Sequence, residues 1–379
     1  MKNVLKLFLK ISVAFALVTN FVLAQDDISK IDKNFVVEKV GKVNVVFRDA
    51  LKNPFVLEGF PFREEGKQLR RLPYSIADNK TTSGGLRKLS YYTSGGVVRF
   101  RTNAKNIILR AKIQNRQFNM GHMPSTSSSG FDLFADNKEH VKTVNPAHYK
   151  NEIPDPLVTN LLRNGNGLMR DYSLYMPLFN GVLSLEIGVD PNAKFEQPTS
   201  HKIKKPIVFY GSSITHGACA SRTSLCYPAL VCRDVDAPMV NLGFAGNAKG
   251  EPKMAELISK LDMSVFVYDY DYNAPNAAHL KKTHEKFFKI IRKAQPNLPI
   301  IILTRVTNAG DDRVAVIKQT YENALKNGDK NVYFIDGRDM MKDIDISMLA
   351  VDKVHPNDTG FYLMYKGILP IIKKILKID

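Results

Sequence analysis

The second half of the chain alternates short apolar strands with longer amphipathic helices, and this order limits the fold more than any other feature. After Pro206, five segments are apolar throughout and rich in β-formers, at 207–210, 239–242, 265–268, 300–303 and 332–335. Helical periodicity lies between and after them, at 252–261, 279–294, 313–326 and 360–378. Strands that are apolar on both faces and alternate with helices predict a parallel sheet covered on both sides. We therefore expect a three-layer α/β/α domain.

The first half of the chain has a different pattern. Short segments rich in β-formers occur at 35–40, 97–101, 107–113, 172–176 and 182–187, with turn sequences such as Gly95-Gly96 and Asn180-Gly181 between them. Many short strands with few helical stretches predict an all-β sandwich of the jelly-roll kind. The serine-rich segment 123–130 reads as an exposed loop. The change of pattern at 198–206 divides the chain into a β-sandwich domain at 25–200 and an α/β domain at 201–379.

The first 24 residues have the composition of a secretory signal peptide. Lys2, Lys6 and Lys10 precede an apolar stretch at 11–18, and Val22-Leu23-Ala24 fits a cleavage site. The apolar stretch is short for a membrane-spanning helix, and no stop-transfer pattern follows it. We therefore expect a secreted or periplasmic protein without stable membrane insertion.

Charge and cysteine content narrow the choice of partners. Without the signal peptide, which has three lysines and no acidic residue, the formal net charge falls from +17 to +14. The lysines are dispersed and no nucleic-acid module is visible, so a solvated basic surface is favoured over a nucleic-acid partner. No His or Cys at metal-ligand spacing accompanies Cys219, Cys226 and Cys232. A Cys219–Cys226 disulfide and buried free thiols both stay open, and we expect neither a metal nor a cofactor.

Residues with suitable chemistry for acyl transfer follow the strand candidates. Ser213 stands where the first apolar strand ends in Gly211-Ser212, and Asp352 and His355 lie three residues apart near the C-terminus. A serine becomes a good nucleophile when a histidine accepts its proton and a carboxylate orients that histidine. We predict Ser213 as nucleophile, His355 as base and Asp352 as the orienting carboxylate.

The oxyanion of a tetrahedral intermediate needs hydrogen-bond donors that are already in place. The candidates are the backbone N–H groups of Ser213 and Gly246 and the side-chain amide of Asn273, all of which follow strand candidates. Because the carboxyl ends of parallel strands meet at one edge of a sheet, we expect these groups to converge. The structural alternatives are a glycine that permits a tight turn at 246 and a capping residue at 273.

These motifs resemble the SGNH (GDSL-like) hydrolase superfamily over roughly residues 205–379. The four blocks are Gly211-Ser212-Ser213-Ile214-Thr215-His216-Gly217, the segment 241–246, Asn273, and Asp352-Lys353-Val354-His355-Pro356. The resemblance implies the roles already argued for Ser213, Gly246, Asn273, His355 and Asp352. The chain departs from the family pattern in having Ser212 for the aspartate of the first block, and Asp271-Tyr272-Asn273-Ala274 for Gly-x-Asn-Asp.

The first half resembles the N-terminal β-domain of one bacterial SGNH branch. The segments that carry this resemblance are 98–104 and Gly130-Phe131-Asp132-Leu133-Phe134, in which Phe134 replaces the tyrosine of a Gly-x-Asp-Leu-Tyr signature. The layout is also similar to carbohydrate esterases that pair a jelly roll with an SGNH domain. The resemblance implies a serine esterase that removes a small acyl group, most simply acetyl, from a carbohydrate.

Two other functions stay open. One is a lysophospholipase or thioesterase acting on longer acyl chains, and the other is a glycan-binding protein whose hydrolase domain is inactive. Several side chains also have two interpretations. His216 either lines an acyl pocket or is a hydrogen-bonded structural residue, and the loop with Arg116, Met120 and His122 either borders the site or is simply exposed. The aromatic group Tyr268, Tyr270 and Tyr272 serves either packing or sugar stacking.

Overall fold

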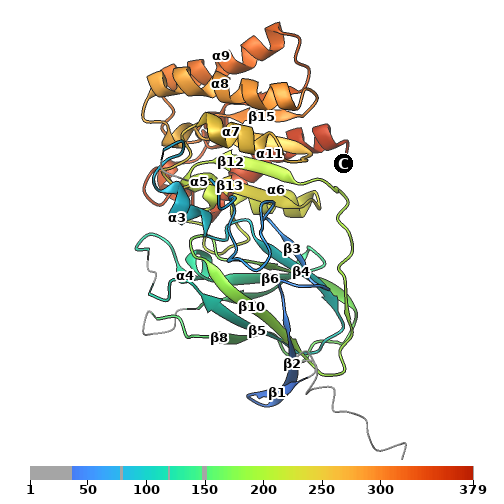
Figure 1. Ribbon diagram of the computed structural model, residues 1–379. Coiled ribbons are helices and arrows are strands. Elements are labelled where there is room, and N and C mark those ends of the chain that lie inside the picture. Colours follow the sequence, from blue (N-terminus) through green and yellow to red (C-terminus); the bar gives the residue numbers. More distant parts are fainter. Residues whose placement is uncertain (1–35, 77–79, 118–119, 147–151, 379) are drawn as a thin grey trace, which may run out of the picture.

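A computed structural model describes residues 36–76, 80–117, 120–146 and 152–378. The expected signal peptide, 1–24, lies outside the described residues. Figure 1 shows two stacked parts, an all-β part built from the first half of the chain and an α/β part built from the second. This arrangement confirms the predicted fold class.

The all-β part consists of two antiparallel sheets packed face to face. The strand order in one sheet is β1 (Val37–Val40), β2 (Val43–Asp49), β10 (Val182–Val189), β5 (Ile107–Ile113) and β8 (Leu157–Leu162). The order in the other is β11 (Phe195–Glu196), β4 (Val97–Thr102), β9 (Arg170–Tyr175), β6 (Phe131–Ala135) and β7 (Glu139–Val144), with β3 (Val56–Glu58) paired to β4. Alternate inward side chains of both sheets form one apolar core, as expected for a sandwich.

Strand β6 carries the Gly-x-Asp-Leu-Phe signature and is buried on both faces. Phe131 and Leu133 belong to the sandwich core, whereas Phe134 belongs to the apolar cluster shared with the α/β part. Asp132, on the same face as Phe134, accepts a hydrogen bond from the hydroxyl of Ser224 in the α/β part. The two-residue period of a strand therefore makes β6 an interface strand between the two parts.

The α/β part is built on a five-stranded parallel sheet. The strand order is β13 (Met239–Gly243), β12 (Ile207–Gly211), β14 (Val265–Asp269), β15 (Ile300–Leu303) and β16 (Val332–Ile335). Ile207 and Phe209 face the side covered by α6 (Tyr227–Asp234) and α11 (Asp358–Leu376). Val208 and Tyr210 face the side covered by α7 (Pro252–Ile258), α8 (Ala277–Ala294) and α9 (Asp311–Lys326). The alternation explains why these strands are apolar throughout.

The two parts share a continuous apolar core. Tyr92, Phe134, Tyr175 and Phe179 of the first half pack in one cluster with β12, α6 and α11. The short helix α3 (Leu86–Ser90) lies between the sandwich and the α/β part in Figure 1. Within the described residues, no helix combines the length and the apolar character that crossing a bilayer requires.

One expectation about the first half is wrong. The segment 123–130 is not an exposed loop but contains helix α4 (Ser125–Ser128), and Ser127, Ser128 and Ser129 are buried. The carbonyl oxygens of Ser127 and Ser128 accept hydrogen bonds from the N–H groups of Leu178 and Phe179, both at 3.0 Å. Backbone pairing with a distant segment thus buries a polar sequence that has no apolar pattern of its own.

Candidate active site

The site lies at the carboxyl edge of the parallel sheet. Strand β12 has β13 on one side and β14 on the other, so the chain changes direction across the sheet at this point, where α/β folds place their sites. Ser213 follows β12, Gly246 follows β13, and Asn273 ends the 3₁₀ helix η2 (Asp271–Asn273) after β14. Asp352 and His355 lie in the loop between α10 (Ile346–Leu349) and α11.

Ser213 is the first residue of the short helix α5 (Ser213–His216). Ser212 caps this helix, because its hydroxyl accepts the N–H of Ile214 at 3.1 Å. Aspartate is an equally good capping residue, so the departure at 212 leaves the local geometry intact. The Oγ of Ser213 lies 2.9 Å from Nε2 of His355.

Gly211 permits this sharp turn out of the strand. A Cβ there would lie 2.3 Å from the carbonyl oxygen of Asp269 and 2.0 Å from Oγ1 of Thr215. Only glycine therefore lets helix α5 start directly above β14.

The carboxylate of Asp352 contacts His355 through both oxygens. Oδ2 lies 2.7 Å from Nδ1 of His355, while Oδ1 accepts the N–H of His355 at 2.7 Å and that of Val354 at 3.0 Å. Partial burial raises the pKa of Asp352, but the hydrogen bonds from His355 and Val354 outweigh it and lower the value to about 2. Asp352 is therefore ionised, Nδ1 of His355 carries the ring proton, and Nε2 is free to accept a proton from Ser213.

The loop that carries Asp352 and His355 is fixed from within and from β15. Val351 donates its N–H to the carbonyl of His355 at 2.9 Å. Asn308 donates its amide to the carbonyl of Lys353 at 3.0 Å, and Thr307 donates its hydroxyl to the carbonyl of Val354 at 3.3 Å. Thr307 and Asn308 were not among the predicted site residues, and the signal for them in the sequence is their position as polar residues shortly after the strand candidate at 300–303.

The two remaining oxyanion candidates lie next to each other. The N–H of Gly246 donates to Oδ1 of Asn273 at 3.2 Å, and Nδ2 of Asn273 donates to the carbonyl of Phe244 at 2.9 Å. Gly246 has a φ of +69°, which a residue with a side chain rarely adopts, although no atom lies within 4 Å of where its Cβ would be. The structure thus brings Ser213, Gly246 and Asn273 to one edge, with the last two donors bonded to each other.

One residue of the first half lies beside this group. The ring of His122, exposed on the loop between β5 and α4, has its centroid 6.0 Å from that of His355. Arg116 of the same loop forms an ion pair with Glu152 at 2.8 Å and donates to the carbonyl of Ile153. The structure thus brings His122 next to His355, whereas Arg116 contacts Glu152 and Ile153 of the first half.

Of its two interpretations, His216 fits that of a hydrogen-bonded structural residue. It is fully buried, stacks on Phe179 at 4.1 Å between ring centroids, and donates from Nε2 to the carbonyl of Leu178 at 2.7 Å. Burial holds its pKa well below the ordinary value, so the ring is neutral. It does not line a cavity at Ser213.

The aromatic group has a packing role. Tyr268 and Tyr270 are buried and stack with Phe287 of α8. Tyr272 bonds through its hydroxyl to Oγ1 of Thr307 at 2.8 Å, which adds support to the loop of His355. Tyr268 and Tyr270 are too buried to stack on a sugar, and Tyr272 is half-buried.

Asp269 is a buried carboxyl under the nucleophile helix. Its Oδ2 accepts the hydroxyls of Thr215 and Tyr227, each at 2.9 Å. Burial raises the pKa of Asp269 to about 7, and these two hydrogen bonds oppose the rise. Asp269 therefore anchors α5 from below and faces neither Ser213 nor His355.

The three cysteines are buried free thiols. Of the two alternatives, the structure therefore has free thiols and not a Cys219–Cys226 disulfide. Burial raises the pKa of Cys219 to about 12 and that of Cys226 to about 11, which makes both poor nucleophiles at neutral pH. In the described part of the chain, no cluster of three or more His, Cys, Asp or Glu side chains has the geometry of a metal site.

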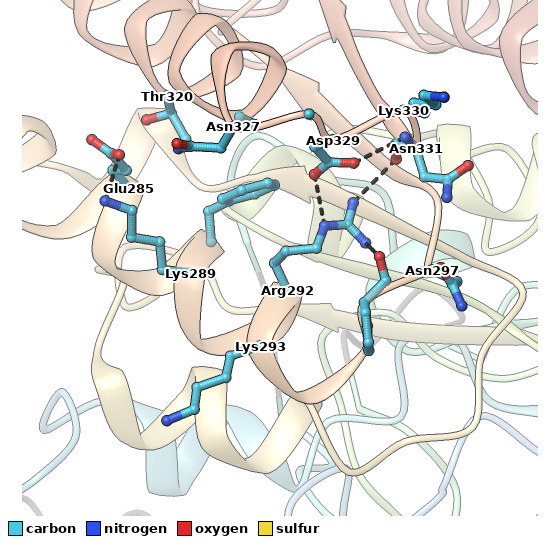
Figure 2. A pocket seen from close by; sticks show the side chains of 14 residues that line it. Glu285, Lys289, Arg292, Lys293, Asn297, Thr320, Asn327, Asp329, Lys330 and Asn331 are labelled. Carbon is cyan, nitrogen blue, oxygen red and sulfur yellow. Dashed lines mark hydrogen bonds and ion pairs between the residues drawn. The ribbon is translucent and has the colours of Figure 1, made fainter.

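A cavity of about 660 Å³ lies away from Ser213, between α8 and α9. Figure 2 shows two ion pairs among its charged groups: Arg292 bonds to Asp329 at 2.7 Å, and Lys289 to Glu285 at 2.8 Å. None of the candidate catalytic residues lines this cavity. The candidate catalytic residues instead lie together at the carboxyl edge of the sheet.

Two family models match the chain in the order of its two parts. Residues 204–373 match the GDSL-like Lipase/Acylhydrolase family, and residues 45–195 match GxDLY, the N-terminus of Esterase_SGNH_hydro-type. A comparison with curated proteins gave no match.

Solved structures with both parts resemble the chain over most of its length. A Bacteroides ovatus protein described as a GDSL-like lipase is 27% identical with a TM-score of 0.75, covering 89% of this chain and 99% of its own. A salicylyl-acyltransferase from a tetracycline biosynthetic pathway is 19% identical with a TM-score of 0.72, covering 87% and 97%. An acetyl xylan esterase from the rumen bacterium Butyrivibrio proteoclasticus is 12% identical with a TM-score of 0.59, covering 88% and 99%. At these identities the last two show the fold alone.

Proposed function

We propose that the protein is a secreted or periplasmic serine esterase. The premise is that this carboxylic ester hydrolase joins a GxDLY N-terminal domain to a GDSL-like lipase/acylhydrolase domain. Its substrate is a small acyl ester, most simply acetyl, on a carbohydrate. The observation that carries the proposal is the chain of contacts from Ser213 through His355 to Asp352, at 2.9 and 2.7 Å.

The mechanism follows from these contacts. Oγ of Ser213 attacks the ester carbonyl while Nε2 of His355 accepts the hydroxyl proton. Asp352 stabilises the resulting imidazolium and keeps its ring in position. His355 then protonates the departing sugar oxygen, which leaves an acyl group on Ser213. His355 then accepts a proton from a water molecule, which attacks the acyl carbonyl. As the bond to Ser213 breaks, His355 returns this proton to Oγ, and the acyl group leaves as a carboxylic acid.

The oxyanion of each tetrahedral intermediate is received by Ser213 N–H, Gly246 N–H and the Asn273 amide. Nδ2 of Asn273 has two hydrogens and uses one on Phe244, so the second is available to the oxyanion. The hydrogen bond from the N–H of Gly246 to Oδ1 of Asn273 is long, at 3.2 Å. When negative charge develops on the substrate oxygen, this N–H turns to the oxyanion and forms a shorter bond. Each donor of this kind typically raises kcat by about 10²- to 10³-fold, which corresponds to about 3 to 4 kcal/mol of transition-state stabilisation.

Three features support a small acyl group on a carbohydrate and an extracellular location. The two-part layout is that of the acetyl xylan esterase, whose name states its substrate class. His122 brings the first half next to His355, where an extended substrate would pass. The N-terminal 24 residues have the signal-peptide composition, and the proposal includes mature domains at 25–200 and 201–379.

The decisive experiment is acetate release from a panel of acetylated oligosaccharides, with the native protein and Ser213→Ala side by side. Release by the native protein that the variant loses would establish a serine carbohydrate esterase and identify its sugar. If nitrophenyl acetate is cleaved but no sugar is deacetylated, the carbohydrate assignment fails while Ser213 stays the nucleophile.

The two alternatives have their own tests. A lysophospholipase or thioesterase would retain activity on nitrophenyl esters longer than butyrate, whereas the proposed enzyme loses it steeply. An inactive glycan-binding protein would leave Ser213 unlabelled by a fluorophosphonate probe in folded protein. N-terminal sequencing of exported protein tests cleavage after Ala24.

A further inference from the structure

Arg71, in the first half of the chain, is a fully buried cation. Its Nε donates to the carbonyl of Tyr92 at 2.8 Å and its Nη2 to the carbonyl of Leu89 at 2.9 Å. Burial lowers the pKa of Arg71 to about 9, still well above neutral, so the side chain is charged at neutral pH. Among the described residues no carboxylate pairs with it, and four backbone carbonyls accept its hydrogen bonds. Its Nη2 also lies 3.5 Å from Nε2 of His216.

The other edge of the guanidinium contacts the α/β part at the end of β13. Nη1 donates to the carbonyl of Asn241 at 2.9 Å and to that of Gly243 at 2.8 Å. The guanidinium also lies over the ring of Phe244, 4.5 Å from its centroid. Arg71 therefore fixes the last residues of the strand that leads into the loop of Gly246.

Phe244 connects this contact to both loop donors of the oxyanion hole. Its carbonyl accepts Nδ2 of Asn273 at 2.9 Å, and Oδ1 of Asn273 accepts the N–H of Gly246 at 3.2 Å. A shift of Phe244 would therefore move Asn273 and, through it, Gly246. We infer that Arg71 is a positioning residue for the oxyanion hole, and that its unpaired charge favours the negatively charged tetrahedral intermediate. This inference rests on the proposed function.

The charge of Arg71 also reaches the nucleophile helix. Nη2 of Arg71 lies 3.5 Å from Nε2 of His216, the last residue of α5, which begins with Ser213. After burial, this contact with Arg71 is the next cause that lowers the pKa of His216. A carboxylate paired with Arg71 would largely cancel its charge at a distance, and in the described part of the chain Arg71 has no such partner. Negative charge that develops on the substrate at the start of α5 would experience the same field with the opposite, favourable sign.

A second attachment from the first half follows the same loop. The N–H of Gly85 donates to Oδ1 of Asn247 at 3.0 Å, and the N–H of Ser83 donates to Oε1 of Glu251 at 3.2 Å. A Cβ at Gly85 would lie 2.5 Å from Asn247 Oδ1, so glycine permits this close approach. The first half thus contacts the loop on both sides of Gly246.

The test compares Arg71→Lys and Arg71→Met with Arg70→Met. Arg70 is the matched control, because it is 3% exposed and its partners are Ser90, Ile76 and the rings of Tyr74 and Tyr91, all in the first half. For each variant, kcat and KM on nitrophenyl acetate, the inhibition constant of phenylboronic acid and the melting temperature are measured. A boronic acid bound to Ser213 has a tetrahedral, negatively charged boron, so it reports on the oxyanion hole separately from stability.

We expect Arg71→Lys to lower kcat about 10- to 100-fold and to leave KM within about threefold of the native value. The inhibition constant of phenylboronic acid should rise by a similar factor. Arg71→Met should lower kcat and weaken the inhibition by more than Arg71→Lys does. Arg70→Met should keep the native kcat even if it lowers the melting temperature. The inference is overturned if folded Arg71→Lys has native kcat and inhibition, if Arg70→Met loses as much, or if neither Arg71 variant folds. Activity that survives Ser213→Ala in the same assay would instead refute the proposed function.

Discussion

Asp352 accepts two hydrogen bonds from His355, one from the ring at 2.7 Å and one from the backbone N–H at 2.7 Å. The carboxylate therefore fixes both the tautomer of the ring and the loop conformation that presents it. These two effects can be separated, because asparagine keeps an oxygen for the backbone and offers an N–H where the ring needs an acceptor.

Asp352→Asn is therefore expected to leave the fold intact and lower kcat on nitrophenyl acetate by about 10³- to 10⁴-fold. The ring would then carry its proton on Nε2, which faces Ser213 and could no longer accept. Asp345→Asn is the matched control, since Asp345 is an exposed helix cap that asparagine replaces well. A loss smaller than tenfold at unchanged melting temperature would argue against Asp352 as the orienting carboxylate.

The exposed ring of His122, in the first half, lies beside the ring of His355. With its centroid 6.0 Å from that of His355, it would contact the sugar if the substrate is the proposed carbohydrate ester. We expect His122→Ala to reduce kcat/KM about tenfold on an acetylated oligosaccharide and less than twofold on nitrophenyl acetate. Lys142→Ala, on the exposed side of β7, should change neither value. Equal losses on the two substrates would mean that His122 acts on His355 rather than on the sugar.

Regular periodicity explains which parts of the fold the sequence predicts. The strands β15 and β16 have the bounds expected from their apolar runs, and Ser213, Gly246 and Asn273 follow strand ends as the parallel-sheet rule requires. Arg71 and Ser127 carry no comparable signal. Their environments depend on partners more than 50 positions away, such as Gly243 and Leu178, and a local pattern does not encode such contacts.

His201 joins the two parts through a titratable contact. Its Nδ1 lies 2.7 Å from Asp236 of the α/β part, and its Nε2 lies 2.9 Å from Glu58 of β3. Burial lowers the pKa of His201, but the hydrogen bonds to Asp236 and Glu58 outweigh it, so the folded pKa is raised despite the nearby Arg99. Both ring nitrogens face acceptors, which favours the imidazolium.

Because the pKa of His201 is higher in the folded than in the unfolded protein, protonation of His201 stabilises the fold. This contribution is complete at pH values below the unfolded pKa of about 6.5 and is lost as the pH rises through the folded pKa. We therefore expect His201→Gln to lower the free energy of unfolding by about 1 to 3 kcal/mol at pH 5.5 and by less at pH 9. Urea denaturation at the two pH values measures this difference. His279→Gln is the matched control, because the ring of His279 contacts a backbone carbonyl, that of Lys249, and no carboxylate within the described residues. A larger effect at pH 9 would reverse the assigned sign.

The shared apolar core predicts that the hydrolase domain does not fold alone. Tyr92, Phe134, Tyr175 and Phe179 of the first half are buried against it, and each such side chain contributes about 1.5 to 3 kcal/mol. Their loss would remove about 6 to 12 kcal/mol, which is comparable to the stability of a typical domain. Residues 201–379 expressed alone should therefore aggregate or melt without cooperativity, and co-expression of residues 25–200 should restore a soluble complex. A cooperative transition within about 5 °C of the full chain would show that the interface contributes little to stability.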